Sequence, residues 1–305
     1  MKEKSIEKCA LARLGRRVCN GIGIVLLAAS CQQNGFPELN EETAPVVLTI
    51  QQFEQIPFDD AFNAQTKAGV NEICTRLHFV LFKDGSKEEM ITQMVGDEGF
   101  GTLSKNLCVG THQLVVIAHN GDANASITTP EKVEFSSNKS TTRVTDTFYY
   151  YGEIEVRKDG TNRFSISLKR AVAKFRLNLS GAIPDNVTKL VFAYSGGSMS
   201  LNPQTGTGAA KSNQTEELAV LPDKTVYEVY TFPRSDSQAL KMTITAFDEF
   251  GNNLKETLFE EVPIARNRIT VYQGDLFAGG VNSYTTGDFG ITVEDEWTVS
   301  ETFQF

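Results

Sequence analysis

The sequence predicts an all-β protein with two β-sandwich domains in tandem. Short apolar segments recur roughly every ten residues after residue 45, with Gly, Pro, Asn and Asp between them. No long helical periodicity occurs past residue 31, and 40% of the residues are hydrophobic, which is enough to build packed cores. A final stretch with strict alternation of apolar residues adds a strand at the C-terminus.

The first 30 residues are predicted to be a signal peptide. They carry six basic and two acidic side chains, and Gly21–Ala29 is apolar but too short to span a bilayer. Small residues then lead directly to Cys31, as in a bacterial lipobox. The similarity implies cleavage before Cys31 and acylation of its thiol. The alternative is an ordinary secretory signal in which Cys31 has no role.

The charge of the chain limits its partners. The net charge is −9, and it becomes −13 once residues 1–30 are removed. A surface this acidic repels nucleic acid and anionic lipid headgroups, so no nucleic-acid partner is expected. Attachment to a membrane would therefore depend on the acyl chains of Cys31.

The first domain is expected at residues 46–170, after a polar tether at 31–45. Its strands are predicted at Val46–Ile50, Ile73–Phe82, Leu114–His119, Asp146–Val156 and Phe164–Leu168. Apolar residues alternate in 73–82, which indicates a half-buried strand. The segment 114–119 is apolar on both faces, which indicates a central strand.

The second domain is expected at residues 171–305. Its strands are predicted at Ala173–Leu179, Lys189–Tyr194, Ser198–Leu201, Leu218–Leu221, Tyr227–Phe232, Lys241–Asp248, Leu254–Val262 and Ile269–Phe277. Residues 202–216 are rich in Gly, Thr, Ser and Asn, which is typical of a flexible loop.

The C-terminal tail, residues 288–305, is predicted to be a long strand with one apolar face. Seven of the nine odd positions from 289 to 305 are apolar, and no even position is. Period 2 over this length exceeds the roughly five or six residues of an ordinary strand. Such a strand is either a bent last strand or a donor for β-strand addition to another protein. The donor residues would be Phe289, Ile291, Val293, Trp297, Val299 and Phe303.

The sequence contains no pattern that favours catalysis. The three histidines have no zinc-binding spacing, no serine nucleophile elbow is present, and no metal site or cofactor is expected. His78 is interpreted as a partly buried strand residue. Cys74 and Cys108 are the one pair available for a disulfide if Cys31 is acylated, and two buried thiols are the alternative.

Several segments resemble the fimbrillin superfamily of Bacteroides-type bacteria, and in particular its anchor-subunit branch. They are Leu114–Gly121, Asp146–Tyr151, Arg170–Phe175 and Asn267–Phe277. The resemblance implies two transthyretin-like, immunoglobulin-like sandwich domains and assembly by donation of a C-terminal strand. In shaft subunits a protease cuts the N-terminal strand away after an Arg, and the matching stretch here carries Lys67.

The resemblance also implies a role. A cut near Lys67 would separate the β-domains from the acyl group on Cys31, so an anchor must keep its N-terminal strand at Val46–Ile50. The expected function is a lipid-anchored, non-enzymatic subunit on the outer membrane at the cell surface. It would join a shaft pilin through its tail and end fibre growth. The alternative is a tip adhesin or a glycan-binding lipoprotein.

Overall fold

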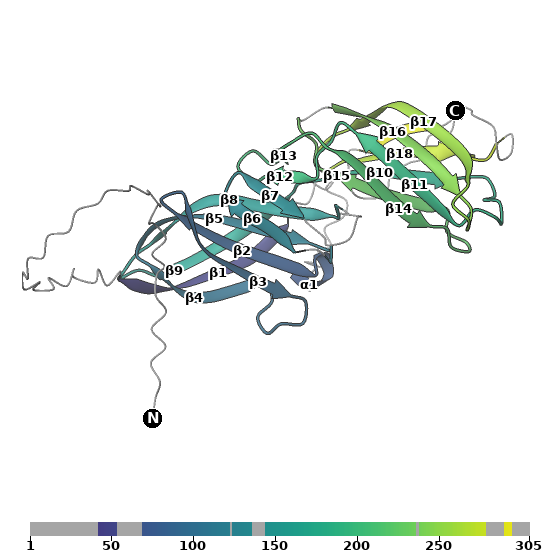
Figure 1. The fold of residues 1–305 in the computed structure, drawn as a ribbon. Coiled ribbons are helices and arrows are strands. Elements are labelled where there is room, and N and C mark those ends of the chain that lie inside the picture. The colour runs from purple at the N-terminus through teal and green to yellow at the C-terminus, as the bar shows by residue number, and fades with distance from the viewer. Residues whose placement is uncertain are drawn as a thin grey trace, which may run out of the picture.

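The described residues form β-strands and the turns between them, with one helical turn, which confirms the prediction of an all-β protein. The computed structural model describes residues 42–53, 69–122, 124–135, 144–235, 238–278 and 290–294. Figure 1 shows two groups of sheets side by side, one from strands before residue 170 and one from strands after it. Within the described residues, helix α1 (Val70–Ile73) is a single turn, and no helix is long and apolar enough to cross a membrane.

The first group is a seven-stranded sheet that folds back on itself. The strand order is β3-β2-β5-β8-β9-β1-β4. The strands are β1 (Thr43–Phe53), β2 (Arg76–Lys83), β3 (Ser86–Met94), β4 (Thr102–Cys108), β5 (Gly110–His119), β8 (Thr147–Val156) and β9 (Asn162–Arg170). β8 and β9 pair only at two positions, Phe148 with Arg170 and Tyr149 with Lys169. The two halves of the sheet therefore separate beyond this corner and enclose a core between them.

Strands β2 and β5 are buried on both faces. Leu77, Phe79 and Leu81 face the core of the sandwich, while Val80 and Phe82 face a second core. The hairpin of β6 (Ala125–Thr129) and β7 (Lys132–Phe135) packs over that second face. The prediction of a half-buried strand at 73–82 is therefore wrong. The prediction of a central strand at 114–119 is confirmed, because β5 lies between β2 and β8.

The second group is a sandwich of two four-stranded sheets with orders β15-β10-β18-β19 and β14-β11-β16-β17. The first sheet has β10 (Ala173–Leu179), β15 (Val226–Thr231), β18 (Ile269–Gly274) and β19 (Gly290–Glu294). The second has β11 (Lys189–Ser195), β14 (Asn213–Ala219), β16 (Gln238–Phe247) and β17 (Asn253–Ile264). Alternate residues of the strands point inward, so Phe175, Phe192 and Ile244 meet in one core.

A small sheet crosses the junction between the two groups. β12 (Ser200–Asn202) pairs with β7 of the first group and with β13 (Thr207–Gly208) of its own, giving the order β13-β12-β7-β6 (Figure 1). Leu201 and Phe232 pack with Val80 and Ile117 in the second core. Since residues 207–208 and 213–219 are strands, the prediction of a flexible loop at 202–216 is wrong.

Arg170 fastens the same junction. Its Nε and Nη2 donate to the two carboxylate oxygens of Asp146 at 2.8 and 3.1 Å, and its Nη1 donates to Asn267 Oδ1 at 3.0 Å. The guanidinium lies 4.5 Å from the ring centre of Phe148. Arg266 donates to the Arg170 carbonyl at 2.9 Å. One largely buried arginine thus connects the end of the first group to the β17–β18 turn of the second.

Candidate functional site

The N-terminal strand β1 is an interior strand of the first sandwich. It pairs antiparallel with β4 and parallel with β9, so it is hydrogen-bonded along both edges. Its inward side chains Val46, Leu48 and Ile50 are at most 5% exposed. The strand predicted at 46–50 is confirmed and extends further at both ends.

A polar contact fixes the start of β1. Asn162 Nδ2 donates to the Pro45 carbonyl at 3.3 Å and to the Arg157 carbonyl at 2.9 Å, while its Oδ1 accepts the Arg157 N–H at 2.9 Å. Pro45 has no N–H to donate, so the proline leaves no donor unpaired there. The side chain of Asn162 therefore joins the turn before β9 to the first residues of β1.

The described part of the predicted donor tail pairs with its own chain. β19 is antiparallel to β18, with Gly290 opposite Gln273 and Glu294 opposite Ile269. Ile291 and Val293 lie in this strand, which is the last strand of its sheet among the described residues. Phe289, Trp297, Val299 and Phe303 lie outside the described residues, as do Cys31 and Lys67. Donation of the tail to a partner stays a prediction.

The possible disulfide between Cys74 and Cys108 does not form, because Cys74 is a free thiol. Cys74 lies two residues before β2 begins at Arg76, which pairs with His119. Cys108 lies beyond the opposite end of this strand pair, where Phe82 pairs with Gln113. Six residues of strand separate these ends, roughly 20 Å. A disulfide needs Cα atoms within about 7 Å. Burial raises the pKa of the Cys74 thiol to about 12.

The structure brings together two histidines that the sequence did not connect. His78 of β2 and His119 of β5 are fully buried, and their Nε2 atoms are 3.0 Å apart. Gly121 N–H donates to His119 Nδ1 at 3.1 Å, so His119 carries its proton on Nε2 and donates it to His78. His78 Nδ1 then donates to Thr92 Oγ1 at 2.9 Å. The interpretation of His78 as partly buried is therefore corrected to fully buried.

This chain of hydrogen bonds requires two neutral rings. Burial, together with the charge of Arg76, lowers the pKa of His78 to about 4. Burial, His78 and Arg76 lower the pKa of His119 to about 3. His119 also makes an edge contact with Phe135 of β7, which in turn stacks on Phe232 from the second group. The two histidines thus lie beneath the β6–β7 hairpin, which packs between the first and the second group of strands.

The third histidine has a different environment. His112 Nδ1 is 2.6 Å from Glu88, and its Nε2 is 2.7 Å from the Cys108 carbonyl. Burial opposes its charged form, but the hydrogen bonds to Glu88 and Cys108 raise its pKa above the ordinary value. In the part of the chain that the structure describes, no three His, Cys, Asp or Glu side chains gather as metal ligands.

A protein-family model described as a family of unknown function, DUF6562, matches residues 125–302, more than half of the chain. The chain belongs to this family. The matched residues of this DUF6562 protein run from the β6–β7 cover through the whole second sandwich. No curated protein matches the chain.

Solved structures of Bacteroides and Porphyromonas proteins are similar to this DUF6562 protein. A candidate polysaccharide-binding protein (DUF1812) from Bacteroides thetaiotaomicron has a TM-score of 0.50 at 12% identity, over 76% of this chain and 92% of that one. A candidate adhesin from Bacteroides ovatus has a TM-score of 0.48 at 12% identity, over 82% and 93%. The tip fimbrial protein Mfa3 from Porphyromonas gingivalis, with C-terminal truncation, has a TM-score of 0.43 at 10% identity, over 84% and 100%.

Proposed function

We propose that this protein is a lipid-anchored fimbrial subunit. It attaches the fibre to the outer membrane at the cell surface through acylated Cys31 and joins a shaft pilin by donating its C-terminal strand, which limits further growth. In this role it is a structural protein without enzymatic activity, cofactor or nucleic-acid partner.

The observation that carries the proposal is the position of β1. The strand begins at Thr43, twelve residues after Cys31, and it is paired on both edges. Its removal would expose Val46, Leu48 and Ile50, each of which gains about 1.5–3 kcal/mol from burial. An acyl group attached ahead of such a strand is held to the whole sandwich. A subunit that gave up its N-terminal strand would lose its membrane attachment.

Cell fractionation tests the anchor. Cys31→Ala should move the protein from the membrane to the soluble fraction and release fibres into the medium. Cys74→Ala is the matched control, because it removes a thiol that is buried in the first sandwich, and it should leave the protein in the membrane fraction. Mass spectrometry of the wild type should find an acylated N-terminal Cys31. An unmodified N-terminus at another residue would contradict lipidation.

A pair of neighbouring substitutions tests strand donation. Val293→Asp places a charge on the predicted apolar face of the tail, and Thr292→Asp places the same charge on the other face. Only the first should abolish capture of the shaft pilin from membranes. Equal effects of the two substitutions, or normal fibres after deletion of residues 288–305, would mean that the tail is only the last strand of its domain.

The alternative function is a tip adhesin or a glycan-binding lipoprotein. One feature favours it, a cationic recess between β11 and β16 in the second sandwich. Deletion of residues 288–305 separates the two functions. It should release fibres if the protein is an anchor, and it should leave ligand binding intact if the protein is a binding module.

A further inference from the structure

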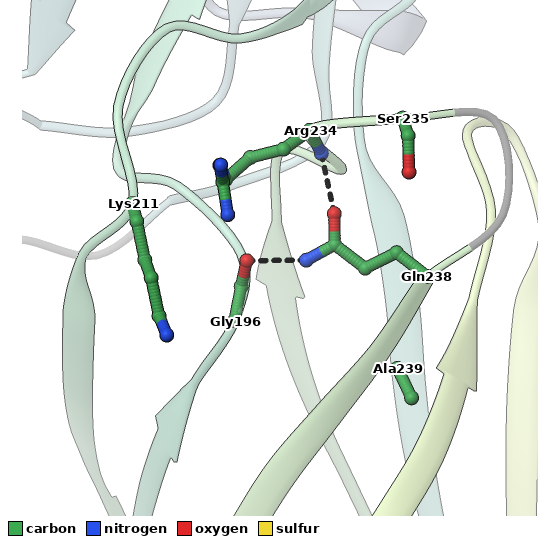
Figure 2. A pocket seen from close by; sticks show the side chains of 6 residues that line it. All are labelled: Gly196, Lys211, Arg234, Ser235, Gln238 and Ala239. Carbon is green, nitrogen blue, oxygen red and sulfur yellow. Dashed lines mark hydrogen bonds between the residues drawn. The ribbon is translucent and has the colours of Figure 1, made fainter.

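A polar recess of about 370 Å³ opens at one end of the second sandwich. It is lined by Gly196, Lys211, Arg234, Ser235, Gln238 and Ala239. Figure 2 shows Lys211 and the guanidinium of Arg234 on one side of the Gly196 carbonyl and Gln238 on the other. The recess lies where β11 ends and β16 begins, at the end of the sandwich that faces the domain junction.

The side chain of Gln238 connects two backbone segments that line this recess. Its Oε1 accepts the backbone N–H of Arg234 at 2.8 Å, and its Nε2 donates to the Gly196 carbonyl (Figure 2). Gly196 has a φ of +113°, and a Cβ there would lie 2.8 Å from the Ala239 carbonyl, so a glycine is required. The amide of Gln238 retains one free N–H and one lone pair for a ligand.

The stem of Arg234 runs beside Gly208, while the residue as a whole is exposed. A Cβ on Gly208 would come within 3.2 Å of Arg234 Cγ, so the stem of the arginine lies close against the backbone of that glycine. Figure 2 shows the guanidinium of Arg234 beside the Gly196 carbonyl. The planar fork of a guanidinium matches two oxygens of an oxyanion.

The two cations of the recess have no acidic partner among the described residues. Other surface lysines of the second sandwich do: Lys189 pairs with Glu217 at 3.0 Å, and Lys241 pairs with Glu260 at 2.8 Å. On a chain with a net charge of −9, two neighbouring cations without an acidic partner in the described part of the chain attract anions locally.

We propose that this recess binds an oxyanion, the carboxylate or sulfate group of an acidic polysaccharide. Arg234 contacts two oxygens of the group through its planar fork, and Lys211 supplies a second positive charge. The lining contains no large apolar side chain, so it suits one small charged group rather than an apolar anchor. The recess is open to solvent, so the group can belong to a longer chain whose hydroxyls reach the Gln238 amide.

Calorimetric titration of the purified protein at constant ionic strength tests this assignment. The probes are tetragalacturonate, sodium sulfate and an Asp-rich peptide of the same charge as the saccharide. Tetragalacturonate should bind with 1:1 stoichiometry and more tightly than either other probe. If sulfate binds saturably and tetragalacturonate does not, the ligand of the recess is a free anion and the polysaccharide assignment is wrong. Tighter binding of the peptide would overturn the saccharide assignment.

Variants localise the binding. Lys211→Ala/Arg234→Ala should weaken tetragalacturonate binding at least tenfold, whereas Lys189→Ala/Lys241→Ala removes the same charge and should change it less than twofold. Gln238→Ala leaves the net charge unchanged and should also weaken binding severalfold. Equal losses in the two charge variants would show attraction without a site and overturn the proposal. Circular dichroism of each variant checks folding, and the titration does not depend on fibre anchoring.

Discussion

Acidification should weaken the packing between the first sandwich and its cover through His78 and His119. The neutral pair is linked by one hydrogen bond between the two rings, and both outer nitrogens are already committed to Gly121 and Thr92. A proton added to His119 would meet the N–H of Gly121. A proton added to His78 would meet the N–H of His119. Either added proton breaks this series of hydrogen bonds, and the positive charge of Arg76 repels a protonated ring at both positions.

The expected change in the free energy of unfolding follows from the lowered pKa of the buried histidines. A pKa that falls from 6.5 to about 4 on folding corresponds to about 3 kcal/mol, because one pKa unit is about 1.4 kcal/mol. The pKa of His119 is lowered as well, to about 3, so both rings stay neutral in the folded protein above about pH 5 and their contributions add there. Since the folded pKa is lowered, the unfolded chain binds protons first. The contribution is complete above pH 6.5 and is lost as the pH falls from 6.5 towards 4.

Urea unfolding followed by circular dichroism measures this effect. The free energy of unfolding should drop by about 3 kcal/mol between pH 6.5 and 5, and the variant His78→Gln/His119→Gln should lose most of this dependence. His112→Gln is the control with the opposite sign, because the raised pKa of His112 stabilises the folded state at low pH. A wild-type profile that is parallel to that of the double variant would refute the neutral-pair reasoning.

Three further outcomes can be tested with single changes. Arg170→Ala should destabilise the protein by about 3 kcal/mol because it leaves Asp146 without its bidentate partner, whereas Arg157→Ala, which breaks an exposed ion pair with Glu155, should have little effect. Urea unfolding compares the two variants. Leu48→Ala should destabilise by about 2–5 kcal/mol in the same measurement, as expected for a fully buried leucine. Cys74 should resist iodoacetamide in the folded protein and react only in urea, as mass spectrometry of the alkylated protein would detect.

Local sequence patterns predicted where strands form but not which segments pack against them. The short apolar segment 46–50 predicted β1 because such a segment, set off by turn residues, is enough to indicate a strand. The second face of β2 was misread because its cover comes from residues 125–135 and from Leu201, far away in the chain. A pattern within one strand carries no information about which other segment will cover it.

Composition misled in the segment 202–216 for a similar reason. Its small polar residues favour a loop, yet β12 gains a partner in β7 and Gly206 lies against the hydroxyl of Tyr149 from the other group. The His78–His119 pair was equally beyond prediction, because it depends on the register between β2 and β5. Long-range pairing, rather than local propensity, decided each of these features.

The two terminal strands differ in how firmly they are held, and this bears on which one can be exchanged. β1 is paired on both edges and buried, whereas β19 is paired to β18 alone among the described strands. Donation of the tail requires residues 290–294 to leave β18 or to pair through their other edge, because one backbone group cannot serve two partners at once. Hydrogen exchange should therefore be at least 100-fold faster in β19 than in β1. Addition of the shaft pilin should protect β19 and leave β1 unchanged. Equal protection of the two strands in the isolated protein would mean that β19 is a permanent part of its sandwich, and the donor would then have to lie in residues 295–305 alone.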